Sequence, residues 1–120
     1  MAVDQRDVYL LPWYLDPKEE DHLYIVLSIR EANDHESTFV AVPITTSAVF
    51  NNDYSFQLSN DMFEEPLKKS NSHARMHLVT LCLNNEIVGK RMNRMKSQYF
   101  RQLMKDIGDL VFNYDFTPNP

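Results

Sequence analysis

Two histidines and an arginine stand at alternate positions in one short segment of the chain. His73, Arg75 and His77 are each two residues apart, and the surrounding sequence is typical of a strand. Because side chains two apart on a strand face the same side, the three would form one polar row. Histidine exchanges a proton near neutral pH, and arginine presents a planar fork of donors to phosphate oxygens. The row therefore suits acid–base chemistry on a phosphodiester.

Three hydroxyl residues form a second group of candidate site residues. The apolar stretch 39–44 is rich in Val and Ile, which indicates a buried strand, and it ends at Thr45, Thr46 and Ser47. Threonine is stiff at χ1, so hydroxyls at the end of a rigid strand can position a ligand such as a phosphate. A strand that ends in a turn, with the hydroxyls bonded to their own backbone, would give the same pattern.

These residue types match the needs of RNA cleavage without a metal. The 2′-hydroxyl of RNA can attack the adjacent phosphate if a protein supplies a base, an acid and a positive charge for the phosphorane. A solvated His/Arg/His row on an exposed sheet face is the simpler alternative. A metal site is disfavoured, because histidines four apart on a strand are roughly 13 Å apart. No metal and no cofactor is predicted.

Composition predicts one globular domain. The chain has 120 residues and 43% apolar residues, with no apolar run long enough to span a membrane. The N-terminal residues 1–7 lack the pattern of a signal peptide. A lone cysteine, Cys82, lies in an apolar stretch, which indicates a buried, inert thiol. We therefore expect a cytoplasmic protein.

Charge is distributed unevenly along the chain. Residues 1–66 carry thirteen acidic and three basic residues, whereas residues 67–120 carry four acidic and nine basic residues. The two parts thus differ in sign although the net charge is −5. A basic second half suggests an anionic partner, either a nucleic acid or an acidic peptide.

Hydrophobic patterning predicts short strands followed by one helix. Strands are expected at residues 7–13, 23–29, 38–44, 54–58, 72–83 and 87–92, with polar connections at 14–21, 31–37 and 60–69. From Lys96, with Ser97 as N-cap, apolar residues recur at helical spacing: Tyr99, Phe100, Leu103, Met104, Ile107, Leu110 and Val111. This order predicts a small, closed or strongly bent antiparallel sheet with the helix packed on it. The domain is expected at 1–112, followed by a tail at 113–120.

The order of these features resembles the MazF/PemK/Kid toxins of bacterial toxin–antitoxin pairs. The similarity covers about residues 6–111 and is carried by Asp7-Val-Tyr, Ile25-Val-Leu-Ser, Asn33, Val42-Pro-Ile-Thr-Thr-Ser, Phe56, Leu58-Ser and Gly89-Lys-Arg. The resemblance implies a mainly β (α+β) fold, a small SH3-like antiparallel β-barrel with a C-terminal helix. It also implies a homodimeric, metal-independent endoribonuclease, inhibited by a cognate antitoxin with an acidic, disordered tail.

The resemblance also assigns roles to individual residues. Thr45 and Thr46, with Ser47 beside them, correspond to RNA-contacting hydroxyls, and Phe56 corresponds to an aromatic residue near the RNA path. Arg75 falls at the position of a catalytic arginine. His77 falls at the position of a catalytic aspartate, and His73 joins the RNA-binding set as the first member of the polar row.

Two departures bear on activity. The family's Gly-Asp is Arg6-Asp7 here, and its Arg-Pro, whose arginine is catalytic in many members, is His22-Leu23. His22 would have to replace that arginine. Activity is then expected to rise as the pH falls toward histidine protonation, unless a carboxylate such as Asp21 keeps the ring charged.

Two alternatives follow from these departures. The first is a degenerate protein of the same family that binds RNA or antitoxin without cutting. The second is a gyrase-directed toxin similar to CcdB, which shares the barrel and acts through C-terminal residues. Residues 112–116 read Phe-Asn-Tyr-Asp-Phe and lack the closing Trp-Gly-Ile of that toxin.

Overall fold

The fold is a bent antiparallel sheet with two helices. The computed structural model describes residues 2–16 and 18–114. The strands are β1 (Asp7–Leu11), β2 (His22–Val26), β3 (Thr38–Thr45), β4 (Ser55–Gln57), β5 (His73–Arg75), β6 (Thr80–Leu83) and β7 (Val88–Arg94). The helices are α1 (Arg30–Glu36) and α2 (Ser97–Leu110), joined by the 3₁₀ turns η1 (Ala48–Phe50), η2 (Asn60–Met62) and η3 (Asn84–Glu86). The predicted α+β class, with a helix after the sheet, is confirmed.

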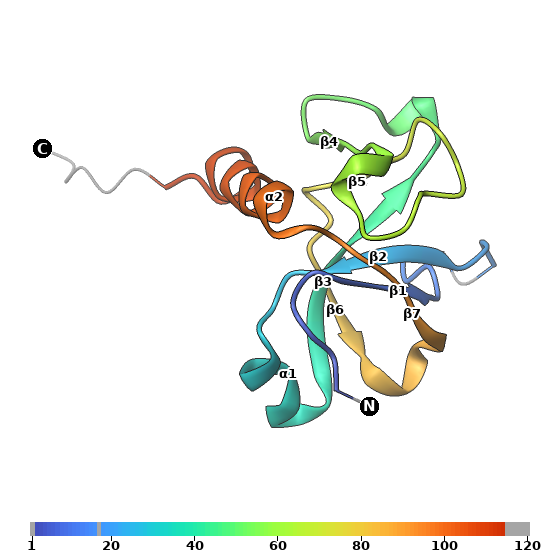
Figure 1. Cartoon of the computed structure of the whole chain (residues 1–120), viewed down its shortest axis with the longest axis vertical. Helices are drawn as coiled ribbons and strands as arrows, with labels where there is room; N and C mark the ends of the chain where they lie inside the picture. The colour runs from blue at the N-terminus through green and yellow to red at the C-terminus, as the bar shows by residue number, and fades with distance from the viewer. Residues whose placement is uncertain (1, 17, 115–120) are drawn as a thin grey trace, which may run out of the picture.

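The sheet bends strongly but is not closed. Its strands follow the order β4-β5-β3-β2-β1-β7, and β6 pairs with β3 (Figure 1). An isolated bridge joins Phe63, before β5, to Met95, after β7. Beside it, the Lys96 amide donates to the Met62 carbonyl at 2.7 Å. The two ends of the sheet thus approach each other through loop contacts, and the barrel predicted from the sequence is an open one.

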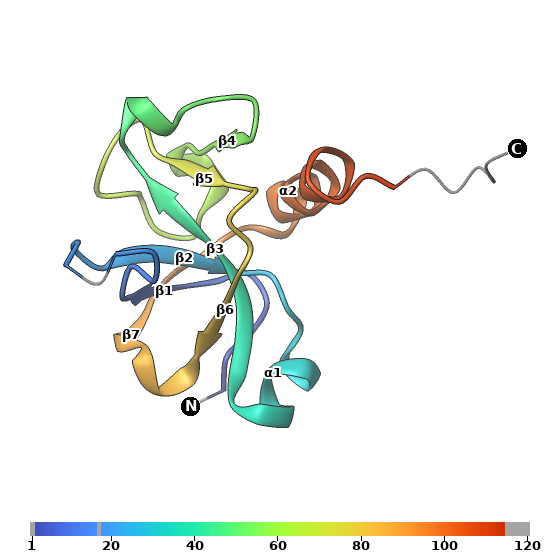
Figure 2. The ribbon, with the colours of Figure 1, turned by 180° about the vertical axis from the view of Figure 1, so that it is seen from behind.

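Strand β3 is the long element that connects the two halves of the molecule (Figures 1 and 2). Its first half pairs with β6 and its last two residues pair with β5. Between the pairs Ala41–Thr80 and Ile44–Ala74, β3 contributes two residues and the opposing segment five, residues 75–79. Extra residues on one strand bulge out and redirect their side chains. The single strand predicted for residues 72–83 is therefore wrong, because a turn interrupts it.

Each face of the sheet carries its own apolar core. One core, centred on Val8, Ile25 and Val42, is covered by Phe100, Leu103 and Ile107 of α2. The other is lined by Val3, Tyr9, Leu11, Tyr24, Val26, Phe39, Ala41 and Cys82. Burial raises the pKa of the Cys82 thiol to about 12, as expected for an inert cysteine.

Two local predictions are corrected by tertiary contacts. Residues 31–36 of the polar segment 31–37 are helical as part of α1, because the buried Asn33 amide donates to the carbonyls of Val3 and Ser28. Helix α2 begins at Ser97 itself, with Lys96 in the N-cap position and no side-chain cap.

Within the described residues, no helix is long and apolar enough to cross a membrane. Most of the predicted tail, residues 115–120, lies outside the described residues.

Candidate active site

The candidate residues converge where β3 ends. Thr45, the last residue of β3, pairs with His73 of β5. On the other side of β3, the His22 ring at the start of β2 lies against the Ile44 carbonyl. Arg75 ends β5, and His77 follows within the bulge. Segments up to 55 residues apart in the sequence thus meet at one end of the sheet.

The His22 ring is oriented by its surroundings. Its Nδ1 is 3.1 Å from the Ile44 carbonyl oxygen. Because a carbonyl only accepts, Nδ1 carries the proton, and Nε2 is left as the atom that can take or give one. The Glu19 carboxylate lies 3.9 Å from Nε2. The carboxylate that faces the ring is therefore Glu19, where the sequence suggested Asp21.

Arg75 is surrounded by aromatic rings. Its Cζ lies 4.1 Å from the centroid of Phe50 and 5.9 Å from that of Trp13, both within cation–π range. Its buried Nε has no hydrogen-bond partner, and among the described residues the guanidinium forms no ion pair. Burial lowers the pKa of Arg75, yet a guanidinium stays protonated near neutral pH. The result is a charged donor group without an anion.

His77 occupies the turn that follows β5. Its side chain is exposed and its ring lies 5.8 Å from that of Tyr54. Partial desolvation, and then the charge of Arg75, lower the pKa of His77. The neutral, proton-accepting form of His77 is therefore favoured at neutral pH.

The polar row expected for His73, Arg75 and His77 does not form. His73 is 1% exposed, and neither of its ring nitrogens has a hydrogen-bond partner. His77 lies beyond the strand, where alternation no longer applies. Phe56 is also buried, in the core beneath α2. His73 and Phe56 are buried because other parts of the fold cover them, and period-two alternation along a strand cannot predict such coverage.

The hydroxyls at the end of β3 differ in their availability. The Thr45 Oγ1 accepts a hydrogen bond of 3.2 Å from the Ser47 amide, as expected of a turn. Thr46 is exposed, and its hydroxyl has no partner among the described residues. Thr46 is therefore the hydroxyl that is free to meet a ligand.

Three aromatic residues of this site were not predicted from the sequence. Trp13 contacts both His22 and Arg75, Phe50 contacts Arg75, and Tyr54 contacts His77. Phe50 and Tyr54 are large apolar residues that remain exposed. Trp13 and Tyr54 stand at the ends of the expected strands 7–13 and 54–58, and Phe50 stands between two expected strands. Aromatic residues at strand ends are the sequence signal that could have pointed to them.

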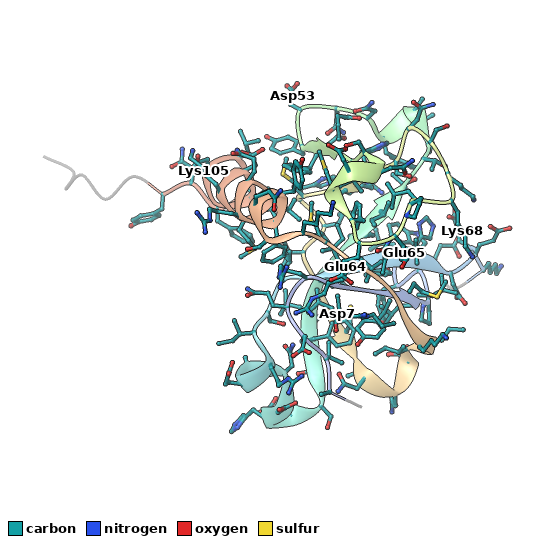
Figure 3. The ribbon with its side chains drawn as sticks, viewed as in Figure 1. Asp7, Asp53, Glu64, Glu65, Lys68 and Lys105 are labelled. Atoms are coloured by element: carbon teal, nitrogen blue, oxygen red, sulfur yellow. The ribbon has the colours of Figure 1, made fainter. Side chains whose placement is uncertain are left out.

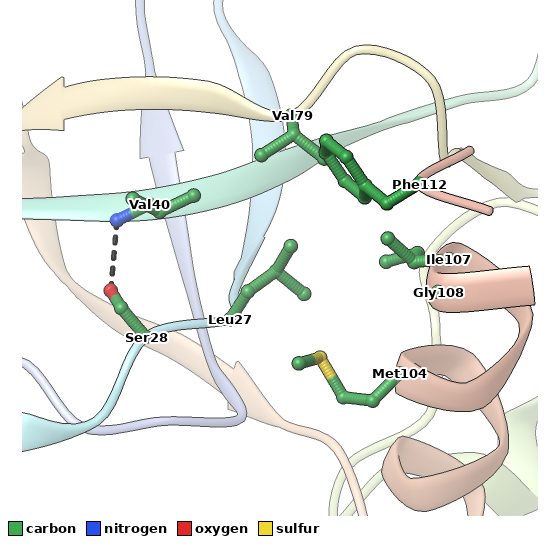
Figure 4. Close-up of a pocket in the computed structure, with 8 residues that line it drawn as sticks. All are labelled: Leu27, Ser28, Val40, Val79, Met104, Ile107, Gly108 and Phe112. Atoms are coloured by element: carbon green, nitrogen blue, oxygen red, sulfur yellow. Dashed lines mark hydrogen bonds between the residues drawn. The ribbon is translucent and has the colours of Figure 1, made fainter. Parts of the chain in front are cut away.

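An apolar groove lies elsewhere, between the sheet and α2. It is lined mainly by Leu27, Val40, Val79, Met104, Ile107 and Phe112 and has a volume of about 320 Å³ (Figure 4). The Ser28 hydroxyl beside it is occupied by a hydrogen bond from the Val40 amide. None of the candidate residues lines this groove. Within the described residues, no three His, Cys, Asp or Glu side chains are grouped so as to hold a metal.

Comparison with known families decides the relationship. Residues 4–111 match the family of PemK-like, MazF-like toxins of type II toxin–antitoxin systems. The chain belongs to this family. The match covers nearly all of the chain, so this MazF-type toxin carries the family domain from β1 to the end of α2. A search of curated proteins returns no match.

Solved structures confirm the fold of this MazF-type toxin. MazF from Deinococcus radiodurans gives a TM-score of 0.71 at 11% identity, over 94% of this chain and 99% of that one. The Mycobacterium tuberculosis toxin MazF-mt6 gives 0.67 at 14% identity, over 92% and 100%. An endoribonuclease in complex with its cognate antitoxin, from a mycobacterial species, gives 0.69 at 13% identity, over 99% and 98%. At these identities the likeness concerns the fold.

Proposed function

We propose that this MazF-type toxin is a metal-independent endoribonuclease that cleaves single-stranded RNA through attack of a 2′-hydroxyl on the adjacent phosphate. The observation that carries the proposal is that one indole, Trp13, contacts both His22 and Arg75 near the end of β3, and that the charge of Arg75 acts on His77. A cation without an anion beside two imidazoles is the set that this reaction needs. Two of the structurally similar proteins are also named as an endoribonuclease or a MazF toxin.

Arg75 is the group that stabilises charge. Its buried Nε has no hydrogen-bond partner and its charge has no carboxylate partner among the described residues, so a phosphate that enters the site would supply both. The phosphorane carries more negative charge than the ground-state phosphate, so the interaction strengthens in the transition state. Thr46, with Thr45 and Ser47, positions the adjacent sugar–phosphate backbone of the RNA. Phe56 and His73 are buried and so do not face the RNA; His73 instead pairs with Thr45 across the sheet.

The exposed imidazole of His77 and the half-buried imidazole of His22 divide the proton transfers. His77, whose pKa is lowered, takes the proton of the 2′-hydroxyl as that oxygen attacks phosphorus. The bond from phosphorus to the 5′-oxygen breaks, and His22 donates a proton from Nε2 to this leaving oxygen. The products are a 2′,3′-cyclic phosphate and a 5′-hydroxyl, and no water or metal is consumed in the step.

The partners follow from the same reasoning. The basic second half of the chain suits RNA and also an acidic antitoxin tail. One structurally similar endoribonuclease was solved with its cognate antitoxin. We extend that partnership, and a homodimeric state, to this chain as part of the proposal.

The test is incubation of the purified protein with a long RNA in EDTA, at pH values from about 5.5 to 8. We expect cleavage with cyclic-phosphate and 5′-hydroxyl ends, and no cleavage at a site whose 2′-hydroxyl is replaced by hydrogen. Intact RNA at every pH would overturn the proposal. Retained RNA binding without cleavage would instead identify the degenerate, binding-only protein.

A further inference from the structure

We propose that Trp13 is a positioning residue that holds His22 and Arg75 in their catalytic arrangement. The inference rests on the proposed function and adds a residue to it. Trp13 contacts the imidazole of one and the guanidinium of the other, two side chains that otherwise come from separate strands. It thereby links the proton donor to the charge-stabilising group.

The backbone around Trp13 is anchored next to β2. Trp13 lies two residues beyond the end of β1, where Leu11 pairs with His22. The Tyr24 hydroxyl donates to the Pro12 carbonyl at 3.1 Å. Trp13 also packs against the core formed around Tyr24 and Phe39. The indole is therefore part of a fixed wall and does not sit on a mobile loop.

The first contact restricts the imidazole. The ring centroids of Trp13 and His22 are 4.6 Å apart with an interplanar angle of 37°, which is stacking distance. The Ile44 carbonyl holds Nδ1 at 3.1 Å. Together the two contacts fix both the plane of the ring and its rotation, so that Nε2 has one direction in which to donate.

The second contact restricts the guanidinium. Arg75 lies 5.9 Å from the Trp13 ring and 4.1 Å from the Phe50 ring. Aromatic contacts cover the faces of a guanidinium and leave its N–H edge available, which suits a bidentate contact to phosphate. Without the indole, the long arginine side chain would have Phe50 alone to orient it.

The test compares Trp13→Leu, which keeps apolar volume but removes the π system, with Trp13→Phe, which keeps a ring. We expect kcat for RNA cleavage to fall about 100-fold in Trp13→Leu with little change in KM, since misplaced reacting groups cost about this much. Trp13→Phe should recover most of the loss. Tyr14→Leu is the matched control, because Tyr14 packs on the same core one residue away. It should lower thermal stability without lowering kcat.

A double-mutant cycle separates positioning from simple packing. If Trp13 acts through His22, the Trp13→Leu change should cost much less in a His22→Ala background than in the wild type. Equal costs in both backgrounds would overturn the proposal. A rise in KM with unchanged kcat in Trp13→Leu would also overturn the proposal, because it would make Trp13 an RNA-binding residue.

A second readout does not depend on activity. Nitrogen-15 NMR of the His22 ring reports which nitrogen carries the proton. At a pH high enough for the ring to be neutral, we expect a single form with the proton on Nδ1 in the wild type and in Tyr14→Leu, and a mixture of tautomers in Trp13→Leu. An unchanged tautomer in Trp13→Leu would overturn the positioning role even if the protein cleaves RNA. A changed tautomer in a protein that cleaves no RNA would leave the positioning intact and the proposed function overturned.

Discussion

The molecule contains two arginine clusters that are built in opposite ways. At the end of β3, Arg75 lies among aromatic rings and no carboxylate pairs with it in the described residues. At the junction of β1 and β7, Arg91 and Arg94 lie 3.5 Å and 3.7 Å from a single oxygen of Asp7, which is buried. Asp7 is labelled in Figure 3. One cluster has a cation that lacks an anion, and the other has an anion held by two cations.

This difference separates a site from a structural contact. Asp7 also accepts hydrogen bonds from the Tyr9 hydroxyl and the Asp4 amide, so its carboxylate organises several segments. Arg75 organises nothing comparable, and its buried Nε remains without a partner. The Arg94 Nε and the Asp7 Oδ1 also lack hydrogen bonds, but these two atoms face each other as an ion pair at 3.7 Å. Arg75 has no such charge partner among the described residues, and an unsatisfied cation is typical of positions where a ligand completes the bonding. We therefore expect the first cluster to determine activity and the second to determine stability.

The largest expected effect is on Arg75. Arg75→Ala should lower RNA cleavage about 1000-fold, because one donor to a developing oxyanion contributes about this much. The melting temperature should fall by only about 5 °C, since no ion pair is lost and the cation–π contacts contribute about 1 kcal/mol. The control is Arg101→Ala, an exposed arginine on α2, which should cleave normally. Equal activity of the two variants would remove the distinction between the clusters.

The next effect is on Asp7. Asp7→Asn should lower the free energy of unfolding by about 2 kcal/mol, because two arginines lose a buried charged partner. Urea unfolding measures it. Asp4→Asn, which breaks the more exposed pair with Arg30, should cost less. Corrected for the folded fraction, cleavage by Asp7→Asn should equal that of the wild type; a specific loss of kcat would place Asp7 in the site.

A smaller effect is expected for Phe50. Phe50→Ala removes the closer of the two rings over Arg75, and a cation–π contact at a partly exposed site contributes about 1 kcal/mol. We expect kcat/KM to fall about fivefold and Phe50→Tyr to retain activity. Val49→Ala, an exposed neighbour on the same 3₁₀ turn, serves as the control. A loss shared by Val49→Ala would indicate a general effect of the turn.

The smallest effect concerns His77 and pH. Its pKa is lowered in the folded protein, so the unfolded chain binds a proton at a higher pH than the folded one does. Its neutral form therefore supports folding fully above the unfolded pKa, and this support is lost as the pH falls toward the folded value. The loss of unfolding free energy between about pH 7.5 and pH 5.5 should be larger for the wild type than for His77→Gln. Parallel losses in both proteins would contradict the assignment.

Patterning predicted most of the regular elements. The strands at β1, β2 and β3 and the helix α2 were located within a few residues, because alternation and helical spacing are visible in the chain. The segment 31–37 was misread as a turn, since α1 depends on the contacts of Asn33 rather than on an apolar stripe. The break between β5 and β6 was missed because residues 72–83 alternate well enough for one strand.

The sequence by itself determined the chemical types at the site and the order in which the chain presents them. Residue type and family resemblance predict proton transfer for His22 and His77 and phosphate binding for Arg75. Only the tertiary structure decided which of them are accessible and what they touch. Strand pairing brings His22 to the end of β3, the bulge at residues 75–79 carries His77 out of the row, and the fold buries His73. Such proximity depends on long-range pairing and packing, which local sequence patterns do not encode.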